Sequence, residues 1–267
     1  MRGFVVYNFS LNIASYTENV TAFSSGLRLD KFSNKEILLN LDEMSDYDFC
    51  VFLDKDISLA KMLEAKGVRL FNNSTAIEIC DNKAYTYVTL KDKISMPRTY
   101  IPPLSFNSPD FYVPYSYPVV IKECYGSLGS QVYLAENEEM ARQIISSLHG
   151  KPFIIQEYIE TFGTDYRLYT VGKKVVASMK RENKNDFRAN CELGGVATCF
   201  SPTPTMIELA EKASEILDLD FGGIDILDTP DQPKLIEVNS SAMVNNIQKV
   251  TGTNIPALLS EHIKKSI

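Results

Sequence analysis

The segments that decide the fold are GGIDIL at residues 222–227 and KLIEV at residues 234–238, both of them short and apolar. Each predicts a β-strand. Because residues i and i+2 of a strand share one face, Glu237 and Asn239 point the same way, and Asp225 meets them if the strands pair antiparallel. Two carboxylates and an amide oxygen form an all-oxygen site of the kind that suits Mg²⁺, which commonly bridges protein carboxylates to phosphates. The alternative is a set of ordinary polar residues on the exposed face of a hairpin.

A second feature begins with the apolar strand predicted at residues 119–122. Lys122 ends this strand, and a small-residue turn containing Gly126, Ser127 and Gly129 follows. Such a turn offers backbone N–H groups to phosphate oxygens, and a nearby lysine adds a positive charge. The order differs from that of a Walker A loop, because the lysine precedes the glycines. The alternative is a plain hairpin turn, where glycines are common for conformational reasons.

A third feature is the apolar strand predicted at residues 153–158, which ends in polar residues and is followed by Ile159. Its backbone groups and the Glu157 carboxylate are suited to an adenine amino group, and the alternative is a strand that ends in solvent. Beyond it, charged and amide side chains precede the flexible pair Gly194-Gly195, which indicates a loop near a ligand. The alternative is that these side chains are solvated, as charged residues on hairpins usually are. The residues are Asp165, Arg167, Lys180, Arg181, Arg188 and Asn190.

The composition narrows the class of protein. The chain has 267 residues, 45% of them hydrophobic, and a formal net charge of −7. Without a block of Lys and Arg, an acidic chain is poorly suited to nucleic acid. No window approaches the ~20 apolar residues that a membrane span needs, and no secretory signal is evident, so we expect a cytoplasmic protein. The five cysteines have no CxxC spacing, which disfavours zinc and a disulfide framework.

The order of elements predicts an α/β fold with α+β lobes. The first 80 residues indicate a small parallel unit, because strand, helix and strand patterns follow one another there. Asn73 is a suitable N-cap for one helix that runs to about Leu90. A Pro-rich linker at residues 102–118 marks a crossing between lobes. Strands are predicted at 3–8, 47–53, 68–71, 119–122, 131–134, 153–158, 166–171, 174–180, 222–227 and 234–238, and further helices at 57–66, 137–148, 205–217 and 254–265.

Taken in order, these segments resemble the ATP-grasp superfamily, and most closely its RimK-type ligases, which attach amino acids, often glutamate, to an acceptor carboxylate. The resemblance covers about residues 73–250 and rests on the combination of motifs. The motifs are GTDYR at 163–167, VGKKVVASMKR at 171–181, FRAN at 187–190, GG at 194–195 and EVNSS at 237–241. It implies three parts: an N-terminal parallel α/β lobe at 1–80, a central lobe with the phosphate loop at 81–157, and a C-terminal antiparallel lobe with the metal site at 158–267.

The resemblance also implies roles for individual residues. The two phosphate-binding lysines are matched by Lys83 and Lys122, and the mobile loop over the phosphates by Gly126, Ser127 and Gly129. The adenine hinge is matched by Gln156, Glu157, Tyr158 and Ile159. Further nucleotide contacts are implied for Asp165, Lys180 and Asn190. Catalytic contacts to substrate or phosphate are implied for Lys122, Arg167 and Arg181. Magnesium ligands are implied for Asp225, Glu237 and Asn239.

The implied activity is ATP-dependent ligation. ATP, with Mg²⁺ or alternatively Mn²⁺, phosphorylates a carboxylate, and an amine then attacks the acyl phosphate and expels phosphate. The partners implied are a small-molecule or peptide carboxylate acceptor and an amino-acid amine; membranes and nucleic acid are not expected, and self-association to a homo-oligomer is typical of the family. Because the carboxylate oxygen is the first nucleophile, the two histidines of the chain need no catalytic role. The alternatives are a phosphotransferase and a non-catalytic nucleotide-binding regulatory module.

Two departures from the family pattern concern the substrates. Ala242-Met243 follows the EVNSS motif where the family commonly has Pro-Gly, and a proline would fix the backbone there. The first 80 residues match only weakly, and this lobe helps to form the acceptor site. The sequence therefore leaves the acceptor and the amino acid undetermined.

Overall fold

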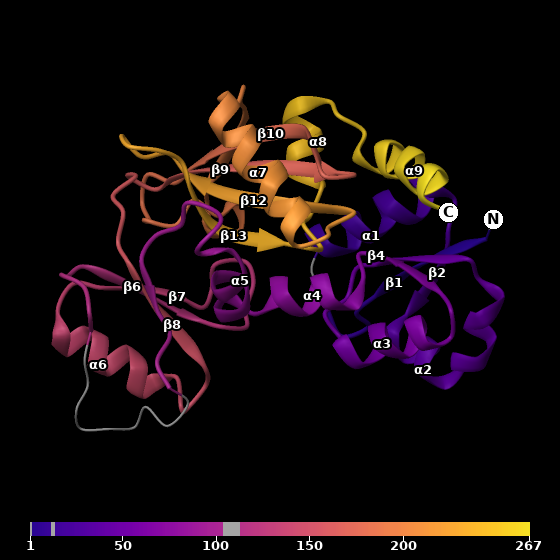
Figure 1. Ribbon diagram of the computed structural model, residues 1–267, viewed down its shortest axis with the longest axis horizontal. Coiled ribbons are helices and arrows are strands. Elements are labelled where there is room, and N and C mark those ends of the chain that lie inside the picture. Colours follow the sequence, from indigo (N-terminus) through magenta and orange to yellow (C-terminus); the bar gives the residue numbers. More distant parts are fainter. Residues whose placement is uncertain (1, 12–13, 104–112) are drawn as a thin grey trace.

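The computed structural model describes residues 2–11, 14–103 and 113–267. These residues form three β-sheets with flanking helices, and Figure 1 shows them as three lobes. The two ends of the chain lie on the same side of the molecule, next to the N-terminal lobe. No helix within the described ranges is both long and apolar enough to span a bilayer.

The N-terminal lobe is a four-stranded parallel sheet with the strand order β2-β1-β3-β4. The predicted parallel unit is therefore confirmed. Every residue of β3 is buried, as expected for a parallel strand covered on both faces. The stretch from 14 to 40, which the sequence left without a prediction, supplies two helices and an edge strand. The elements are β1 (Gly3–Tyr7), α1 (Ala14–Leu27), β2 (Asp30–Ser33), α2 (Asn34–Leu39), the 3₁₀ helix η1 (Leu41–Asp46), β3 (Phe49–Phe52), α3 (Ile57–Ala65) and β4 (Arg69–Phe71).

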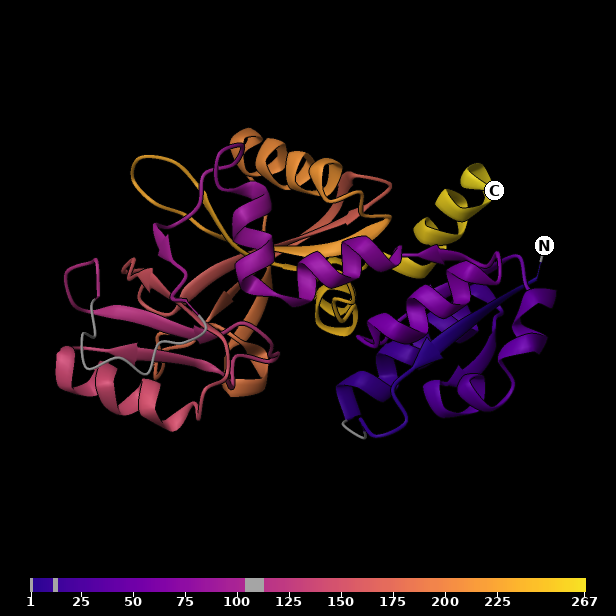
Figure 2. The same cartoon turned by 60° about the horizontal axis from the view of Figure 1, so that its bottom comes forward.

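The single helix predicted from Asn73 to about Leu90 is wrong, because two helices occupy this stretch. Asn73 does cap the first, α4 (Ser74–Asp81), with its side chain accepting from the Ala76 N–H. Asn82 then takes an extended conformation, with φ −110° and ψ 108°, and its side chain caps α5 (Lys83–Leu90). Asparagine favours such caps because its side chain competes for backbone N–H groups. Figure 2 shows the two helices running between the lobes.

The central lobe is an antiparallel sheet with the order β5-β8-β6-β7. The strands predicted at 119–122 and 131–134 pair antiparallel across the small-residue turn, and Asn137 caps the helix that follows them. Of the Pro-rich linker predicted at 102–118, residues 104–112 lie outside the described part of the chain. The elements are β5 (Thr99–Tyr100), β6 (Val119–Glu123), β7 (Val132–Ala135), α6 (Glu138–Ser147) and β8 (Phe153–Glu157).

The C-terminal lobe is a five-stranded antiparallel sheet with the order β11-β10-β9-β12-β13. The two deciding segments pair antiparallel, as the proposed site requires, and Asp225 lies opposite Glu237. Three elements, η2, β11 and α8, were not predicted from the sequence. The elements are β9 (Thr164–Val171), β10 (Lys174–Glu182), η2 (Cys191–Leu193), β11 (Val196–Cys199), α7 (Pro204–Ile216), β12 (Phe221–Leu227), β13 (Lys234–Asn239), α8 (Asn245–Thr251) and α9 (Ile255–Ser266).

The hydrophobic core explains how the lobes are held. Phe23 of the N-terminal lobe packs on Phe221 of the C-terminal lobe, with ring centroids 5.5 Å apart, and Phe71 belongs to the same buried cluster. The central lobe instead has a core of its own, which includes Ile121 and Ile155. A shared core of buried aromatic residues fixes the first and last lobes against each other, because interiors pack without voids. A smaller buried cluster, Ala84 with Cys124 and Ile154, joins α5 to the central lobe.

Candidate active site

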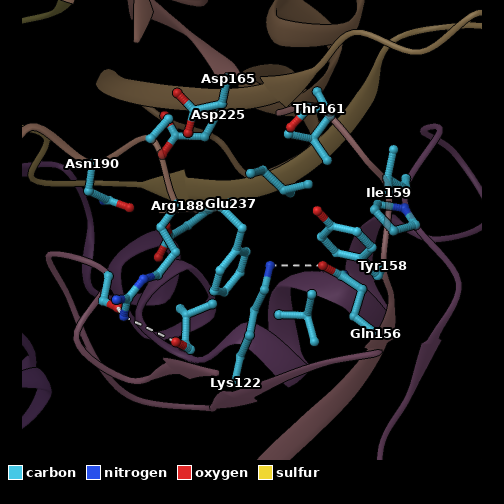
Figure 3. A pocket seen from close by; sticks show the side chains of 18 of the residues that line it. Lys122, Gln156, Tyr158, Ile159, Thr161, Asp165, Arg188, Asn190, Asp225 and Glu237 are labelled. Carbon is cyan, nitrogen blue, oxygen red and sulfur yellow. Dashed lines mark hydrogen bonds between the residues drawn. The ribbon is translucent and has the colours of Figure 1, made fainter. Parts of the chain in front are cut away.

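Two adjoining cavities lie where the lobes meet. The first, of about 830 Å³, lies between the central and C-terminal lobes, and Figure 3 shows the side chains that line it. The second, of about 1210 Å³, extends to the N-terminal lobe, where Asn8, Asp54 and Lys55 line it. The two cavities adjoin, because several residues line both of them. Ligands in the two cavities would therefore lie next to each other. The predicted site residues on both linings are Gly126, Ser127, Arg181, Asn190 and Glu237.

Lys122 lies in the first cavity at the end of β6 and is 8% exposed. Its Nζ donates to Gln156 Oε1 at 2.8 Å (Figure 3), and Gln156 Nε2 donates to Thr99 Oγ1 at 2.9 Å. Burial lowers the pKa of Lys122 to about 8, although the nearby Glu237 carboxylate acts in the opposite direction. An ammonium group held this way is short of anionic partners, and phosphate oxygens would supply them.

Lys83 is brought to the same cavity by the break between α4 and α5. Its backbone N–H donates to Cys124 O at 3.0 Å, which joins the start of α5 to the loop after β6. Its Nζ lies 3.2 Å from Glu237 Oε1. Burial alone would raise the pKa of the Glu237 carboxyl, but Lys83 and Lys122 hold it below its usual value. The unpredicted cap at Asn82 therefore positions a predicted phosphate-binding residue.

A buried network of charges crosses the C-terminal sheet. Arg167 donates to both oxygens of Asp225 at 2.7 Å, and Arg181 Nη2 lies 3.1 Å from Asp225 Oδ2. Arg181 also donates to both oxygens of Asp165, at 2.6 and 2.7 Å. Asp225 is 1% exposed; burial would raise its pKa, but the two guanidinium groups lower it. Both arginines are thus fixed in position by carboxylates, which bidentate pairing makes geometrically specific.

The small-residue turn contacts the opposite wall of the first cavity. Gly129 has φ +75°, and a Cβ at this position would lie 2.7 Å from Asn190 Oδ1. Arg188 Nη1 donates to Gly129 O at 2.9 Å and to Val132 O at 3.2 Å, while its Nη2 is paired with Asp186. Glycine is required here twice over, for the backbone conformation and for the close approach. The turn is therefore held over the cavity by the segment that follows β10.

The end of β8 lines an apolar part of the first cavity. Tyr158 and Ile159 lie there (Figure 3), and Val120 and Ile236 also line the cavity, which gives an apolar surface suited to a flat ring. The carboxylate expected to reach an adenine amino group is occupied, because Glu157 accepts from the backbone N–H and the Nε of Arg98, at 2.8 and 2.6 Å. Backbone groups of this segment remain the contacts that the sequence predicted for the hinge.

Lys180 is the predicted site residue that the structure does not bring to the cavities. It is absent from both linings, and its Nζ lies 2.9 Å from Glu182 Oε1. The reason is strand alternation, because the buried neighbour Arg181 faces the site and successive side chains of a strand point to opposite faces.

The predicted metal ligands gather at one point. Asn239 Nδ2 lies 3.4 Å from Asp225 Oδ2, and Glu237 is the cross-strand partner of Asp225. Within residues 2–11, 14–103 and 113–267, no three His, Cys, Asp or Glu side chains form a metal-holding group. Two carboxylates and an amide fit Mg²⁺, because that ion is usually bound by one or two carboxylates and completes its shell with water and phosphate. Asp225 must exchange at least one arginine contact to take part.

Fold and site together define a three-lobed α/β protein with a cleft where lysine and arginine side chains meet carboxylates, a combination suited to a phosphate group and a metal ion. The RimK-like ATP-grasp domain model matches residues 80–263. A protein from Pseudomonas putida named "Probable alpha-L-glutamate ligase" is 34% identical over 78% of this chain and 71% of its own length. An uncharacterised protein from Mycoplasma pneumoniae is 31% identical over 94% of this chain and 95% of its own.

The chain belongs to the RimK-like ATP-grasp family, since the family's domain model matches well over half of the chain. The solved structure of D-alanine–D-alanine ligase from Bacillus anthracis, complexed with ATP, has a similar fold, with a TM-score of 0.77 at 14% identity over 99% of this chain and 96% of that one. The family and the ATP-grasp fold expected from the sequence are both confirmed.

Proposed function

We propose that this protein is an ATP-dependent ligase that activates a carboxylate as an acyl phosphate and joins it to an amine, in particular that of an amino acid, in an amide bond. The observation that carries the proposal is the shared wall of the two cavities, where Arg181 and Glu237 border both. Because the cavities adjoin at these residues, a nucleotide in one would lie close enough to pass a phosphoryl group to a carboxylate in the other. The name of the Pseudomonas putida relative agrees with this activity.

ATP is proposed to occupy the first cavity. Its adenine ring fits the apolar surface at Tyr158 and Ile159, and its phosphates fit between Lys122, Lys83 and the turn at Gly129. Lysine and backbone N–H groups are the usual partners of phosphate oxygens. We propose phosphate contacts also for Gly126, Ser127 and Asn190 in the lining, a separate nucleotide contact for Asp165, and no contact for Lys180.

Mg²⁺ is proposed to bind at Asp225, Glu237 and Asn239, with Mn²⁺ as the alternative ion. Bound there, it would neutralise charge on the transferred phosphate. Lys83 pairs with the Glu237 carboxylate, so this lysine and the metal ion would share one ligand. Arg167, released from Asp225, is positioned to face the substrate carboxylate in the second cavity, which it lines.

The chemistry needs no protein nucleophile. A carboxylate oxygen of the substrate attacks the γ-phosphorus of ATP, and ADP leaves with the bonding electron pair. The amine then attacks the acyl carbon, loses a proton and expels inorganic phosphate. Lys122 and Arg181 hold and neutralise the anionic oxygens, and rate acceleration comes from this positioning and pre-arranged charge.

The substrates are proposed to bind in the second cavity, which reaches the N-terminal lobe. The proposed division into lobes at 1–80, 81–157 and 158–267 agrees with the sheets, since β1 to β4, β5 to β8 and β9 to β13 fall within these ranges. A cytoplasmic location and a homo-oligomer stay predictions from the sequence and the family.

The test is a screen of amino acids against carboxylate acceptors for ADP release, with mass spectrometry of the products. A ligase forms ADP, phosphate and an amide whose mass equals the two substrates less water, and it does so only when both are present. A phosphorylated product that accumulates without any amine would favour a phosphotransferase. Nucleotide binding without turnover over the whole screen would favour a regulatory module.

A further inference from the structure

Asn72, the residue after β4 in the N-terminal lobe, is fully buried and reaches into the C-terminal lobe. Its side chain takes part in four hydrogen bonds. Nδ2 donates to Phe221 O at 2.8 Å and to Ser240 O at 2.7 Å. Oδ1 accepts from the backbone N–H groups of Asp220 and Phe221, at 2.6 and 3.2 Å. One amide thus uses both of its polar atoms on the main chain of another lobe.

These bonds lie at one end of the ladder between β12 and β13. The last backbone pair of that ladder is Gly223 with Asn239. Beyond it the strands separate, and the Asn72 amide connects the start of β12 at Phe221 with the residue after β13, Ser240. Asn72 therefore holds together two strand ends that do not pair with each other at this point.

The same ladder carries the proposed magnesium ligands. Asn239 precedes Ser240 directly, and Asp225 and Glu237 form the cross-strand pair two positions further along, on the same side of the sheet. A shift of Ser240 would move Asn239 and change its distance to Asp225, which is 3.4 Å here. Partners that orient metal ligands have effects on metal affinity nearly as large as those of the ligands.

We propose that Asn72 is a positioning residue for the magnesium site, which it supports from outside by fixing the ends of β12 and β13. The proposal rests on the proposed Mg²⁺–ATP site and adds a residue of the N-terminal lobe to it. It also assigns a structural partner to the turn before Ala242-Met243, where the family commonly has Pro-Gly. The hydrogen bond from Asn72 to Ser240 holds the backbone of this turn, as a proline at position 242 would do by fixing its φ angle.

A second contact between the lobes provides the matched control. Arg69 Nη2 donates to both oxygens of Asp220, at 3.1 and 2.9 Å, close to the start of β12. It joins the same two lobes, but within the described residues the hydrogen bonds of its side chain go to Leu70 and Asp220 and not to the end of β13. An Arg69→Met variant therefore weakens the docking of the lobes without freeing Ser240, whereas Asn72→Asp removes both donors and keeps the shape of the side chain.

The experiment measures how much Mg²⁺ strengthens the binding of a fluorescent, non-hydrolysable ATP analogue. The Kd is determined in EDTA and in Mg²⁺ for the wild type, Asn72→Asp, Asn72→Ser and Arg69→Met, each at full length. The gain from Mg²⁺ is the ratio of the Kd in EDTA to the Kd in Mg²⁺. We expect this ratio to fall about tenfold in both Asn72 variants, while the Kd in EDTA changes less than twofold. Arg69→Met should keep the whole gain. Asn72→Ser avoids the buried charge that Asp introduces.

Three results would overturn the inference. The first is a folded Asn72 variant with the wild-type gain from Mg²⁺. The second is an equal loss of the gain in Arg69→Met, which would point to general docking of the lobes. The third is that both Asn72 variants fail to fold while Arg69→Met folds, which would make Asn72 a residue of the fold alone. A wild-type protein with no gain from Mg²⁺ would instead contradict the proposed function.

Discussion

Lys122 gives the sharpest prediction, because its pKa of about 8 lies within the range where a protein can be studied. At pH 8.5 a group with this pKa is about one-quarter protonated, and phosphate oxygens that return the pKa to above about 10 make protonation nearly complete. Nucleotide binding at pH 8.5 should therefore take up about 0.7 of a proton. At pH 6.5 Lys122 is already charged, so it contributes almost no uptake there.

The lowered pKa also affects stability in a defined direction. The unfolded chain keeps the Lys122 proton up to about pH 10.5, whereas the folded chain begins to lose it near pH 8. Since the unfolded state binds more protons between these values, the free energy of unfolding gains a contribution that rises with pH. The difference corresponds to about 3 kcal/mol in total.

The assay is isothermal titration calorimetry with an ATP analogue at pH 8.5, in buffers of different ionisation enthalpy. The slope of the observed enthalpy against the ionisation enthalpy gives the protons taken up. Lys122→Met is the control, and it should show neither this uptake nor the rise in stability between pH 8 and 10. If the wild type binds the analogue at pH 8.5 without uptake, or if the variant shows the same uptake, Lys122 does not receive the phosphates.

The remaining predictions concern three positions. Glu237→Ala should reduce Mg²⁺-dependent ADP release by about a hundredfold; wild-type activity in that variant would remove Glu237 from the metal site. Gly129→Ala should raise the KM for ATP about tenfold or more, since its φ is +75° and the new Cβ meets Asn190; an unchanged KM would mean that the turn does not hold ATP. Lys180→Ala should change the KM for ATP by less than about twofold and the free energy of unfolding by less than about 0.5 kcal/mol, because Lys180 lies outside both cavities. A larger change in KM would support the nucleotide contact that the sequence predicted for Lys180.

Local patterns predicted much of the fold because they report on single elements. The alternating residues around Asp225 and Glu237 specified two strands, and the structure pairs them antiparallel. The helix cap at Asn73 was also correct. The break at Asn82 was missed, although an asparagine nine residues after another cap is itself a signal for a new helix start. Helical periodicity alone cannot separate one long helix from two that follow each other directly in the sequence.

Contacts between distant segments were not predictable in the same way. The sequence named Arg167 and Arg181 as cations facing substrate, but not that both would bind Asp225. That arrangement depends on strand register, since Arg167 lies opposite Asp225 across β9 and β12. Asn72 is a similar case, because its partners follow it by about 150 residues and nothing in its own neighbourhood marks it as different from Asn73.

The arginine network also bears on where the reaction takes place. Arg181 is 3% exposed and is held by Asp165 and Asp225 on two sides, yet it lines both cavities. A cation fixed by two carboxylates does not have to reorganise when negative charge develops, which is the condition for efficient electrostatic stabilisation. Arg167 is different, since it lines the second cavity and not the first, and among the described residues its carboxylate partner is Asp225. If a metal ion takes over the Asp225 carboxylate, Arg167 loses its partner and Arg181 keeps one. We therefore expect Arg181 to keep its place between the two cavities, and Arg167 to be released toward the substrate carboxylate when a metal ion binds Asp225.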